Sequence, residues 1–335
     1  MSFKRMVFLS GFLALMVFLS GCGCSKTQLC GDGICDQNEI NNPRLCPRDC
    51  ETVKGQQKRK EQAAGPDYYF IAIHNEPYHD QELDLAENYA ILKEMIKKAD
   101  EYNIKLTLMF SPQWADLIQL DDLEAWKDRG HEIAAHHHSI YHGSWDGYTN
   151  YSREKMEELR KKNRVNIITR KKVPVPETYL GTLDDFMEKL KKINPEMNSG
   201  CVNEEGDKNA MPDGIIYGTC SGYANFGTPG TRIAGDAEAQ KGKNDFVTAG
   251  TVKGITRKWL AHYQIFKDEK AGETMFSSMD SGAYGVVAHS SRGDADEYYE
   301  FLEFLHKKDP GGGGSKTVSE IIEGELLPEE QMGAL

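Results

Sequence analysis

From residue 67 onwards, short apolar runs alternate with amphipathic stretches, and few folds accommodate such an alternation. The run Tyr68–Ile73 is continuously apolar, as expected for a strand buried on both faces. Residues 83–102 then carry apolar side chains at helical spacing, and a second strand-like run covers Ile104–Phe110. Strand, helix and strand in this order predict a parallel sheet covered by helices. For a stretch of this length the natural closed form is a (β/α) barrel.

Composition narrows the class of protein. The chain has 335 residues, of which 39% are hydrophobic, so it can bury an enzyme-sized core and is not largely disordered. A net charge of −12 leaves no basic excess to neutralise phosphates, which argues against a nucleic-acid-binding protein. A mean hydropathy of −0.58 excludes a polytopic membrane protein.

Histidines gather just past the ends of three predicted strands. His74 follows the first strand, four histidines occur among the seven residues 136–142 after the third strand, and His289 follows a late strand over 283–288. In a parallel sheet with helices outside it, active groups lie just past the carboxyl ends of the strands. We therefore expect these side chains to meet at one open mouth of the barrel.

The histidine group at 136–142 predicts a metal site. His138 and His142 would share a face on a helical turn, whereas His136 and His138 would share a face on an extended strand, and the sequence leaves both geometries open. Glu76, after the first strand, would add an oxygen ligand. Two imidazoles and a carboxylate suit Zn²⁺, with Co²⁺, Ni²⁺, Fe²⁺ or Mn²⁺ as alternatives. The other interpretation is a polar loop that faces solvent.

The first residues have the layout of an export signal. Two basic residues precede an apolar run over 6–19, and the sequence Leu-Ser-Gly-Cys then ends at Cys22. This ending resembles a lipobox, so we expect residues 1–21 to be a lipoprotein-type signal peptide and Cys22 to be lipidated. The mature protein would then be exported and tethered to the outer face of the cell membrane. The alternative is simple secretion with ordinary thiols.

Residues 22–50 form a predicted cysteine-rich module. In an exported chain, four cysteines within 21 residues indicate two disulfides in place of a hydrophobic core. These cysteines are Cys30, Cys35, Cys46 and Cys50. Their connectivity stays open, and Zn²⁺ or a Ca²⁺ held by nearby acidic side chains are alternatives to disulfides alone.

A linker separates this module from the main domain. Residues 51–66 are polar and nearly free of large apolar side chains, so the predicted barrel spans 67–335. Within the barrel domain, Cys201 and Cys220 are expected to pair with each other in an oxidising compartment.

The order of these motifs resembles the NodB-homology polysaccharide deacetylases, which are the carbohydrate esterases of family four (CE4). Gly-His-Glu-Ile at 130–133 and His-Ser-Ile-Tyr-His at 138–142 are similar to that family's second motif. Val-Val-Ala-His at 286–289, the helix after it and the Lys-Thr-Val-Ser-Glu-Ile ending resemble its last motif and closing segment. The resemblance covers about residues 67–142 and 283–323.

The resemblance implies a distorted (β/α) barrel that removes acetyl groups from sugar polymers with the help of a bound metal. Glu76 matches the metal-binding acid of the family. His138 and His142 match its metal-binding histidine pair, with His136 as a rival ligand. His289 matches the acid that protonates the leaving amine. The implied substrate is an N-acetylated sugar or another acylated polysaccharide of the cell surface.

Two departures from the family pattern bear on the chemistry. Asn75 occupies the place of the catalytic base, and an amide cannot take up a proton, so His74 or Glu76 would have to substitute. The family's Arg-x-Pro motif is absent from its expected place. A catalytically degenerate carbohydrate-binding or scaffold protein on the same barrel is therefore an alternative function. A hydrolase acting on a peptide or another amide is a third.

Overall fold

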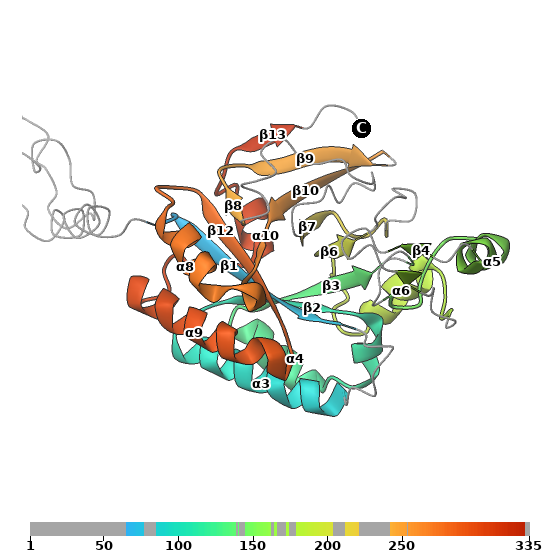
Figure 1. Cartoon of the computed structure of the whole chain (residues 1–335), viewed down its shortest axis with the longest axis horizontal. Coiled ribbons are helices and arrows are strands. Elements are labelled where there is room, and N and C mark those ends of the chain that lie inside the picture. The colour runs from blue at the N-terminus through green and yellow to red at the C-terminus, as the bar shows by residue number, and fades with distance from the viewer. Residues whose placement is uncertain are drawn as a thin grey trace, which may run out of the picture. The chain divides into compact units, whose positions relative to one another are not determined.

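The computed structural model describes residues 65–76, 85–138, 140, 145–161, 164–165, 172–173, 179–203, 212–220, 242–252 and 254–331 (Figure 1). The α-helices in these ranges are α3 (Leu85–Glu101), α4 (Leu120–Asp128), α5 (Arg153–Lys161), α6 (Leu183–Leu190), α8 (Glu269–Ser277), α9 (Arg292–Lys308) and α10 (Val318–Glu323). The strands of the large sheet are β1 (Tyr68–Asn75), β2 (Leu106–Phe110), β3 (Glu132–His138), β6 (Ser199–Asn203), β7 (Tyr217–Cys220), β8 (Lys243–Asn244), β9 (Val247–Val252), β10 (Ile255–Ala261), β11 (Tyr263–Gln264), β12 (Ala283–His289) and β13 (Glu329–Gln331). The short pieces β4 (Arg164–Val165) and β5 (Lys172–Val173) pair separately, and 3₁₀ helices cover Pro112–Asp116 and Ile265–Lys267.

The large sheet closes on itself through one segment of chain. Its strand order is β11-β12-β1-β2-β3-β6-β7-β10-β9-β13, with β8 beside β12. His262 alone separates β10 from β11, and these two strands pair in parallel with β7 and with β12 respectively. The parallel path therefore returns to its start, which confirms the predicted (β/α) barrel. The antiparallel strands β8 and β9 distort it, and Figure 1 shows β9 and β13 on the side of the sheet away from α3 and α9.

Side chains alternate between the two faces of each strand, and the two faces of this sheet have different roles. Inward-facing residues of neighbouring strands meet in one small cluster, made by Ala72, Met109, Ala134, Cys201 and Val287. The outward-facing residues Ile71, Ile73 and Ile133 belong to the main core, which lies between the sheet and its helices. Continuing the alternation along β1 and β3 places His74 and His136 on the inner face, at the carboxyl ends of the strands.

The outer helices follow the predicted helical periodicity. Helix α3 buries Leu92, Met95, Ile96 and Ala99, which are spaced as one face of a helix requires. Helices α3 and α9 lie side by side on the outside of the sheet (Figure 1), and the Tyr298 hydroxyl donates a hydrogen bond of 2.9 Å to the Met95 carbonyl oxygen. In the part of the chain that the structure describes, no helix is long and apolar enough to cross a membrane.

The elements predicted within the two stretches that carry the resemblance, about 67–142 and 283–323, are present. The elements of the stretch between them were not predicted. Strands β1, β2, β3 and β12 and helices α3 and α9 occur where the sequence predicts them. Strands β6 and β7 read Ser-Gly-Cys-Val-Asn and Tyr-Gly-Thr-Cys, which lack an apolar run. Gly200 in β6 is nevertheless required by packing, because a Cβ atom there would lie 2.2 Å from the Ala135 carbonyl oxygen.

Several predictions from the sequence fall outside the described residues. These are the signal peptide over 1–21, lipidation of Cys22, the cysteine-rich module with Cys30, Cys35, Cys46 and Cys50, and nearly all of the linker over 51–66. The sulfur of Cys201 is disulfide-bonded. The side chain of Cys220 is not among those described, so the pairing of Cys201 with Cys220 stays a prediction.

Asn244 stabilises the seam of the barrel, which is the place where β8, β10 and β12 meet. The amide nitrogen of Asn244 donates to the carbonyl oxygens of Gly242, Ala261 and Ala283 at 3.1, 2.9 and 3.2 Å. Its amide oxygen accepts from the Ala261 backbone N–H at 2.6 Å. Asn244 is buried, so these four bonds join β8, β10 and β12 where water cannot replace them.

Replacing Asn244 by Ala is expected to lower the free energy of unfolding by about 2–4 kcal/mol, because buried backbone groups would lose their partner. Denaturant unfolding of the two proteins measures this difference. Asn150→Ala is the matched control, since Asn150 is exposed and accepts one bond, from the Leu183 N–H at 3.1 Å. Equal effects of the two substitutions would contradict the role of Asn244 at the seam.

The buried His131 makes the stability of the barrel depend on pH. Its Nδ1 accepts a bond of 3.0 Å from the Leu106 N–H, and its Nε2 lies 3.0 Å from a carboxylate oxygen of Asp100. Burial lowers the pKa of His131; Arg129 and Lys105 lower it further, while Asp100 opposes them. The folded state therefore binds the proton less readily than the unfolded state, and stability should fall as pH decreases through about 6.5.

We expect the His131→Gln variant to lose less stability than the wild type between pH 7.5 and pH 5.5. The difference between their slopes should be at most ~1.4 kcal/mol per pH unit, the limit for one proton. Urea unfolding at several pH values measures both slopes. Parallel curves for the two proteins would exclude a contribution from His131.

Candidate functional site

The alternation of side chains brings five polar residues from three strands to the inner face of the barrel mouth. They are His74 and Glu76 at the end of β1, His136 and His138 at the end of β3, and His289 at the end of β12. All of them are buried except His289, which is partly buried. The strand ends lie side by side because β1 pairs with β12 up to His289, and β3 follows β2 in the sheet.

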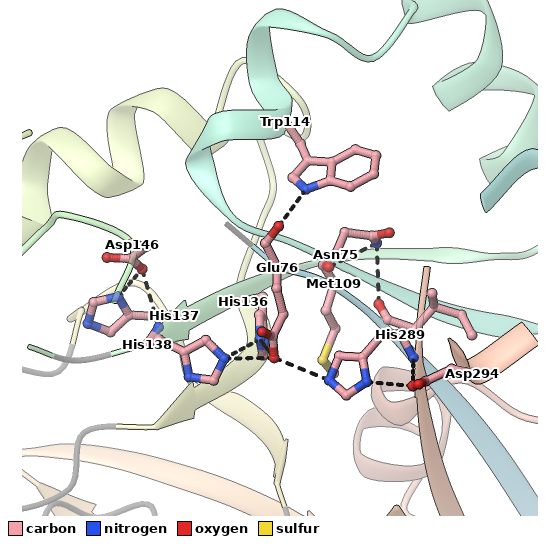
Figure 2. Close-up of polar contacts among 11 residues, drawn as sticks. Asn75, Glu76, Met109, Trp114, His136, His137, His138, Asp146, His289 and Asp294 are labelled. Atoms are coloured by element: carbon pink, nitrogen blue, oxygen red, sulfur yellow. Dashed lines mark hydrogen bonds and ion pairs between the residues drawn. The ribbon is translucent and has the colours of Figure 1, made fainter. Parts of the chain in front are cut away.

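One carboxylate oxygen lies at the centre of this group. Oε1 of Glu76 is 3.0 Å from Nε2 of His138, 3.2 Å from Nε2 of His289 and 3.6 Å from Nε2 of His136 (Figure 2). The Trp114 indole N–H donates a bond of 3.3 Å to the Glu76 carbonyl oxygen, which holds the backbone just past the end of β1. The site therefore has an anion surrounded by imidazole nitrogens.

The spacing of Glu76, His136 and His138 fits a tetrahedral metal ion. The two Nε2 atoms are 2.9 Å apart, and they lie 3.6 and 3.0 Å from the carboxylate oxygen. Ligands bound at ~2.0–2.2 Å to a tetrahedral Zn²⁺ are ~3.3–3.6 Å from one another. The three atoms thus need only small movements to share one ion, and their chemistry is that of Zn²⁺, Co²⁺, Ni²⁺ or Fe²⁺ ligands.

The protonation states of Glu76 and His138 also favour the binding of a cation. Burial alone would raise the pKa of the Glu76 carboxyl, but His138, His136 and His289 outweigh it and hold that pKa well below its usual range. Burial lowers the pKa of His138, although Glu76 opposes that shift. Glu76 is therefore a carboxylate and His138 a neutral imidazole, which are the forms that bind a metal.

His289 is held by a second carboxylate. Its Nδ1 donates to Asp294 at 2.6 Å, and its backbone N–H donates to the same oxygen at 2.8 Å. This bond turns Nε2 toward Glu76 (Figure 2). Burial disfavours a charge on His289, but the hydrogen bonds to Asp294 and Glu76 are stronger and raise the pKa of His289 to about 9. Asp294, in the first turn of α9, was not predicted from the sequence.

Two buried histidines lie beside the central group. The ring of His74 is 4.1 Å from that of His136, 5.3 Å from that of His262 and 5.5 Å from that of His289, centroid to centroid. His262 shares a hydrogen bond of 3.1 Å between its Nδ1 and the Thr219 hydroxyl. Burial and the neighbouring imidazoles lower the pKa values of both residues, that of His262 to about 3. Both are neutral.

His262 is a site residue that the sequence analysis missed. It follows β10 directly, so the rule that active groups lie past strand ends could have found it. The run before it, Ile-Thr-Arg-Lys-Trp-Leu-Ala, has charged side chains in its middle and was not predicted as a strand.

Asn75, which matches the base of the family, faces away from the central group. Its amide nitrogen donates to the carbonyl oxygens of Ile73 and Met109 at 3.3 and 3.0 Å, so it ties β1 to β2 (Figure 2). Because side chains alternate along β1, Asn75 faces outward, between the inward-facing His74 and Glu76. We therefore assign Asn75 a structural role in the sheet. His142 lies outside the described residues, so its place in the site stays a prediction.

The extended form of β3 determines which histidines meet. Because the strand continues to His138, His136 and His138 share its inner face, and this realises the second of the two geometries that the sequence left open. His137 faces outward, where its ring lies 4.9 Å from that of Phe186 on α6. Cys201 is near His74 and His136, but a disulfide-bonded sulfur is not available as a ligand.

No family model matches this sequence. No curated protein matches it either. The solved structures similar to this chain include a carbohydrate esterase of family four and the CE4 domain of a xylanase. A CE4 family pseudoenzyme from Bacillus anthracis is 8% identical, with 80% of this chain and 70% of that chain covered and a TM-score of 0.39.

Two further solved structures have similar scores. The CE4 domain of a multidomain xylanase from the hindgut metagenome of Trinervitermes trinervoides is 10% identical, with coverages of 79% and 96% and a TM-score of 0.37. A peptidoglycan N-acetylglucosamine deacetylase is 9% identical, with coverages of 81% and 92% and a TM-score of 0.35.

Both inward histidines of β3 should be needed for metal binding. We expect His136→Ala and His138→Ala each to weaken Zn²⁺ binding by at least ~100-fold, more than the ~10–100-fold typical of losing an outer partner of a ligand. Competition with a chromophoric chelator measures the affinity. His306→Ala on α9 is the control, because its ring stacks on Tyr102 outside the barrel. Wild-type affinity in His136→Ala would instead favour His138 with His142.

Proposed function

We propose that this chain is a metal-dependent hydrolase of the polysaccharide-deacetylase type, a divergent CE4 member that removes the acetyl group from an N-acetylated sugar of a surface polysaccharide. The observation that carries the proposal is the ring of imidazole nitrogens around Oε1 of Glu76 at the barrel mouth. The motifs at 130–133, 138–142 and 286–289 support the type of reaction.

In this proposal Glu76, His136 and His138 hold the ion, and His142 is a further candidate ligand. A divalent ion bound there would polarise the acetyl carbonyl and activate a water molecule. Zn²⁺ is the ion we favour, since imidazole nitrogens outnumber the single carboxylate in the ligand set. The ligand residues themselves keep the ion at the open end of the barrel, where a sugar chain can approach.

His289 is placed to deliver the proton that the reaction needs. Hydrolysis of the amide breaks its C–N bond, and the leaving nitrogen must take up a proton as it departs. Asp294 fixes Nδ1 of His289, so Nε2 is the nitrogen that faces the centre. With Glu76 holding the ion, the inward side chain left to accept the proton of the water is His74. Nε2 of His74 is buried and makes no hydrogen bond to the described residues.

The proposal also includes the place where the protein acts. The signal-like residues 1–21 and the lipobox-like ending at Cys22 support export and a lipid anchor, with secretion as the alternative. The cysteines of 22–50 support a disulfide-bonded module before the barrel. An acylated polysaccharide of the cell surface is a substrate that a protein in this position would meet.

A second function is favoured by one observation. The amide of Asn75 is bonded to backbone carbonyls, and of the two carboxylates in the described site Glu76 faces imidazoles while Asp294 is bonded to His289. A site without a free carboxylate base would suit a surface protein that binds a polysaccharide and does not cleave it.

Acetate release from N-acetylated chito-oligosaccharides by the untagged full chain tests the proposal. We expect release to stop with a chelator, to return with Zn²⁺ or Co²⁺, and to be absent in His138→Ala. His289→Ala should still bind the metal but turn over ~10²–10⁴-fold more slowly, because only the proton donor is lost. His306→Ala should match the wild type.

The outcomes separate the two functions. A protein that binds Zn²⁺ and retains oligosaccharides but releases no acetate with any of the metals would favour the binding protein. A wild type that binds no divalent metal would overturn the metal centre itself.

A further inference from the structure

The end of β3, which carries the two inward histidines, is supported by a neighbouring strand on one side. Strand β2 pairs with β3 from Glu132 to Ala135 and goes no further. Strand β6 pairs with β3 from Ala135 to His138. Among the described strands, the last three residues of β3 therefore have a ladder partner on the β6 side alone.

The buried Asp146 makes hydrogen bonds to the last two residues of β3. Its Oδ2 accepts a bond of 3.3 Å from the backbone N–H of His138 and another of 2.5 Å from Nδ1 of the outward-facing His137 (Figure 2). Its own backbone N–H donates to the His138 carbonyl oxygen at 3.4 Å. One fully buried residue thus contacts the last two residues of β3 through backbone and side chain.

Asp146 is itself anchored to the outer part of the fold. Its second carboxylate oxygen accepts from the Tyr148 N–H at 3.0 Å, and its carbonyl oxygen accepts from the Gln113 side-chain amide at 2.7 Å. The rings of His137 and Tyr148 pack against Phe186 of α6 at 4.9 and 5.8 Å. The end of β3 is in this way fixed to α6 and to the 3₁₀ helix after β2.

We propose that Asp146 is a positioning residue for the metal centre, acting through His137 and the backbone of His138 to set the direction of the inward imidazoles. The inference rests on the proposed function, because it assumes that His136 and His138 bind a metal. Metal ligands must keep their geometry within ~0.5 Å and 10–20°. A strand end that could twist about its axis would move both imidazoles relative to Glu76, and the hydrogen bonds of Asp146 on the outer face oppose that twist.

Asp146→Asn tests the inference, because the amide keeps the size of the side chain and loses the charge that strengthens both bonds to β3. We expect the variant to remain folded and to bind Co²⁺ ~10–100-fold more weakly than the wild type, the range for residues that orient a ligand. At saturating Co²⁺ its ligand-field absorption bands should differ in position or intensity, a change that a loss of stability alone would not produce. The exposed Asp184→Asn on α6 is the matched control, and it should show wild-type affinity and spectrum.

Gln113→Ala provides a second, milder variant in case Asp146→Asn does not fold. It removes the bond to the Asp146 carbonyl oxygen and leaves the carboxylate in place, so a smaller loss of Co²⁺ affinity with the same spectral change is expected. Wild-type affinity and spectrum in the folded Asp146→Asn, or in Gln113→Ala when the former is unfolded, would overturn the inference.

These outcomes are distinct from failure of the proposed function. A wild type without affinity for Co²⁺ or Zn²⁺ removes the metal centre, and the role of Asp146 with it. A wild type that binds Co²⁺ but releases no acetate overturns the hydrolase, while the affinities of the Asp146 and Gln113 variants still decide the positioning role.

Discussion

The site depends on a buried carboxylate that faces three imidazoles. Burying an isolated carboxylate at the end of the barrel would cost free energy of folding. Burying several imidazoles without a hydrogen-bond acceptor would also cost free energy. Glu76 and its neighbours reduce this cost for each other, because the carboxylate accepts hydrogen bonds from the rings and the rings lower the pKa of the carboxyl. A divalent ion would use the same arrangement in place of the protons. The surrounding barrel has to hold these groups at distances of 3.0 to 3.6 Å.

The closure of the sheet makes this arrangement possible. Glu76 and His138 come from strands separated by β2, and His289 comes from the strand on the other side of β1. In an open sheet their side chains would line a flat edge. Because β10 pairs with β7 and β11 pairs with β12, the strand ends surround a common space. His262, the single residue between β10 and β11, adds one more ring to it.

Several residues that do not face the centre of the site hold its side chains and strands in position. Asn75 ties β1 to β2, Trp114 holds the backbone of Glu76, Asp294 orients His289, and Asp146 contacts the end of β3. These contacts are polar and buried, so each is strong and directional where the strand ladder ends. These contacts hold Glu76, His138 and His289 in a defined arrangement.

Much of the fold, and the identity of most site residues, could be predicted from the chain alone. The alternation of apolar runs and helical periodicity determined the parallel barrel, and the position of polar residues after those runs identified Glu76, His138 and His289. These are local properties, since a strand buried on both faces needs a continuous apolar run whatever its neighbours are. The sequence left both His136 and His142 open as the partner of His138, because the side chains that share a face depend on where β3 ends. The tertiary structure brings His136 to His138: pairing with β6 and the contacts of Asp146 keep the strand extended to His138, and the two-residue repeat then turns His136 inward. The place of His142 stays a prediction. Asp146 and Asp294 join the site only in the folded chain, because neither directly follows a strand. His262 does follow a strand, but the charged residues within that strand do not form the apolar run from which a strand is predicted.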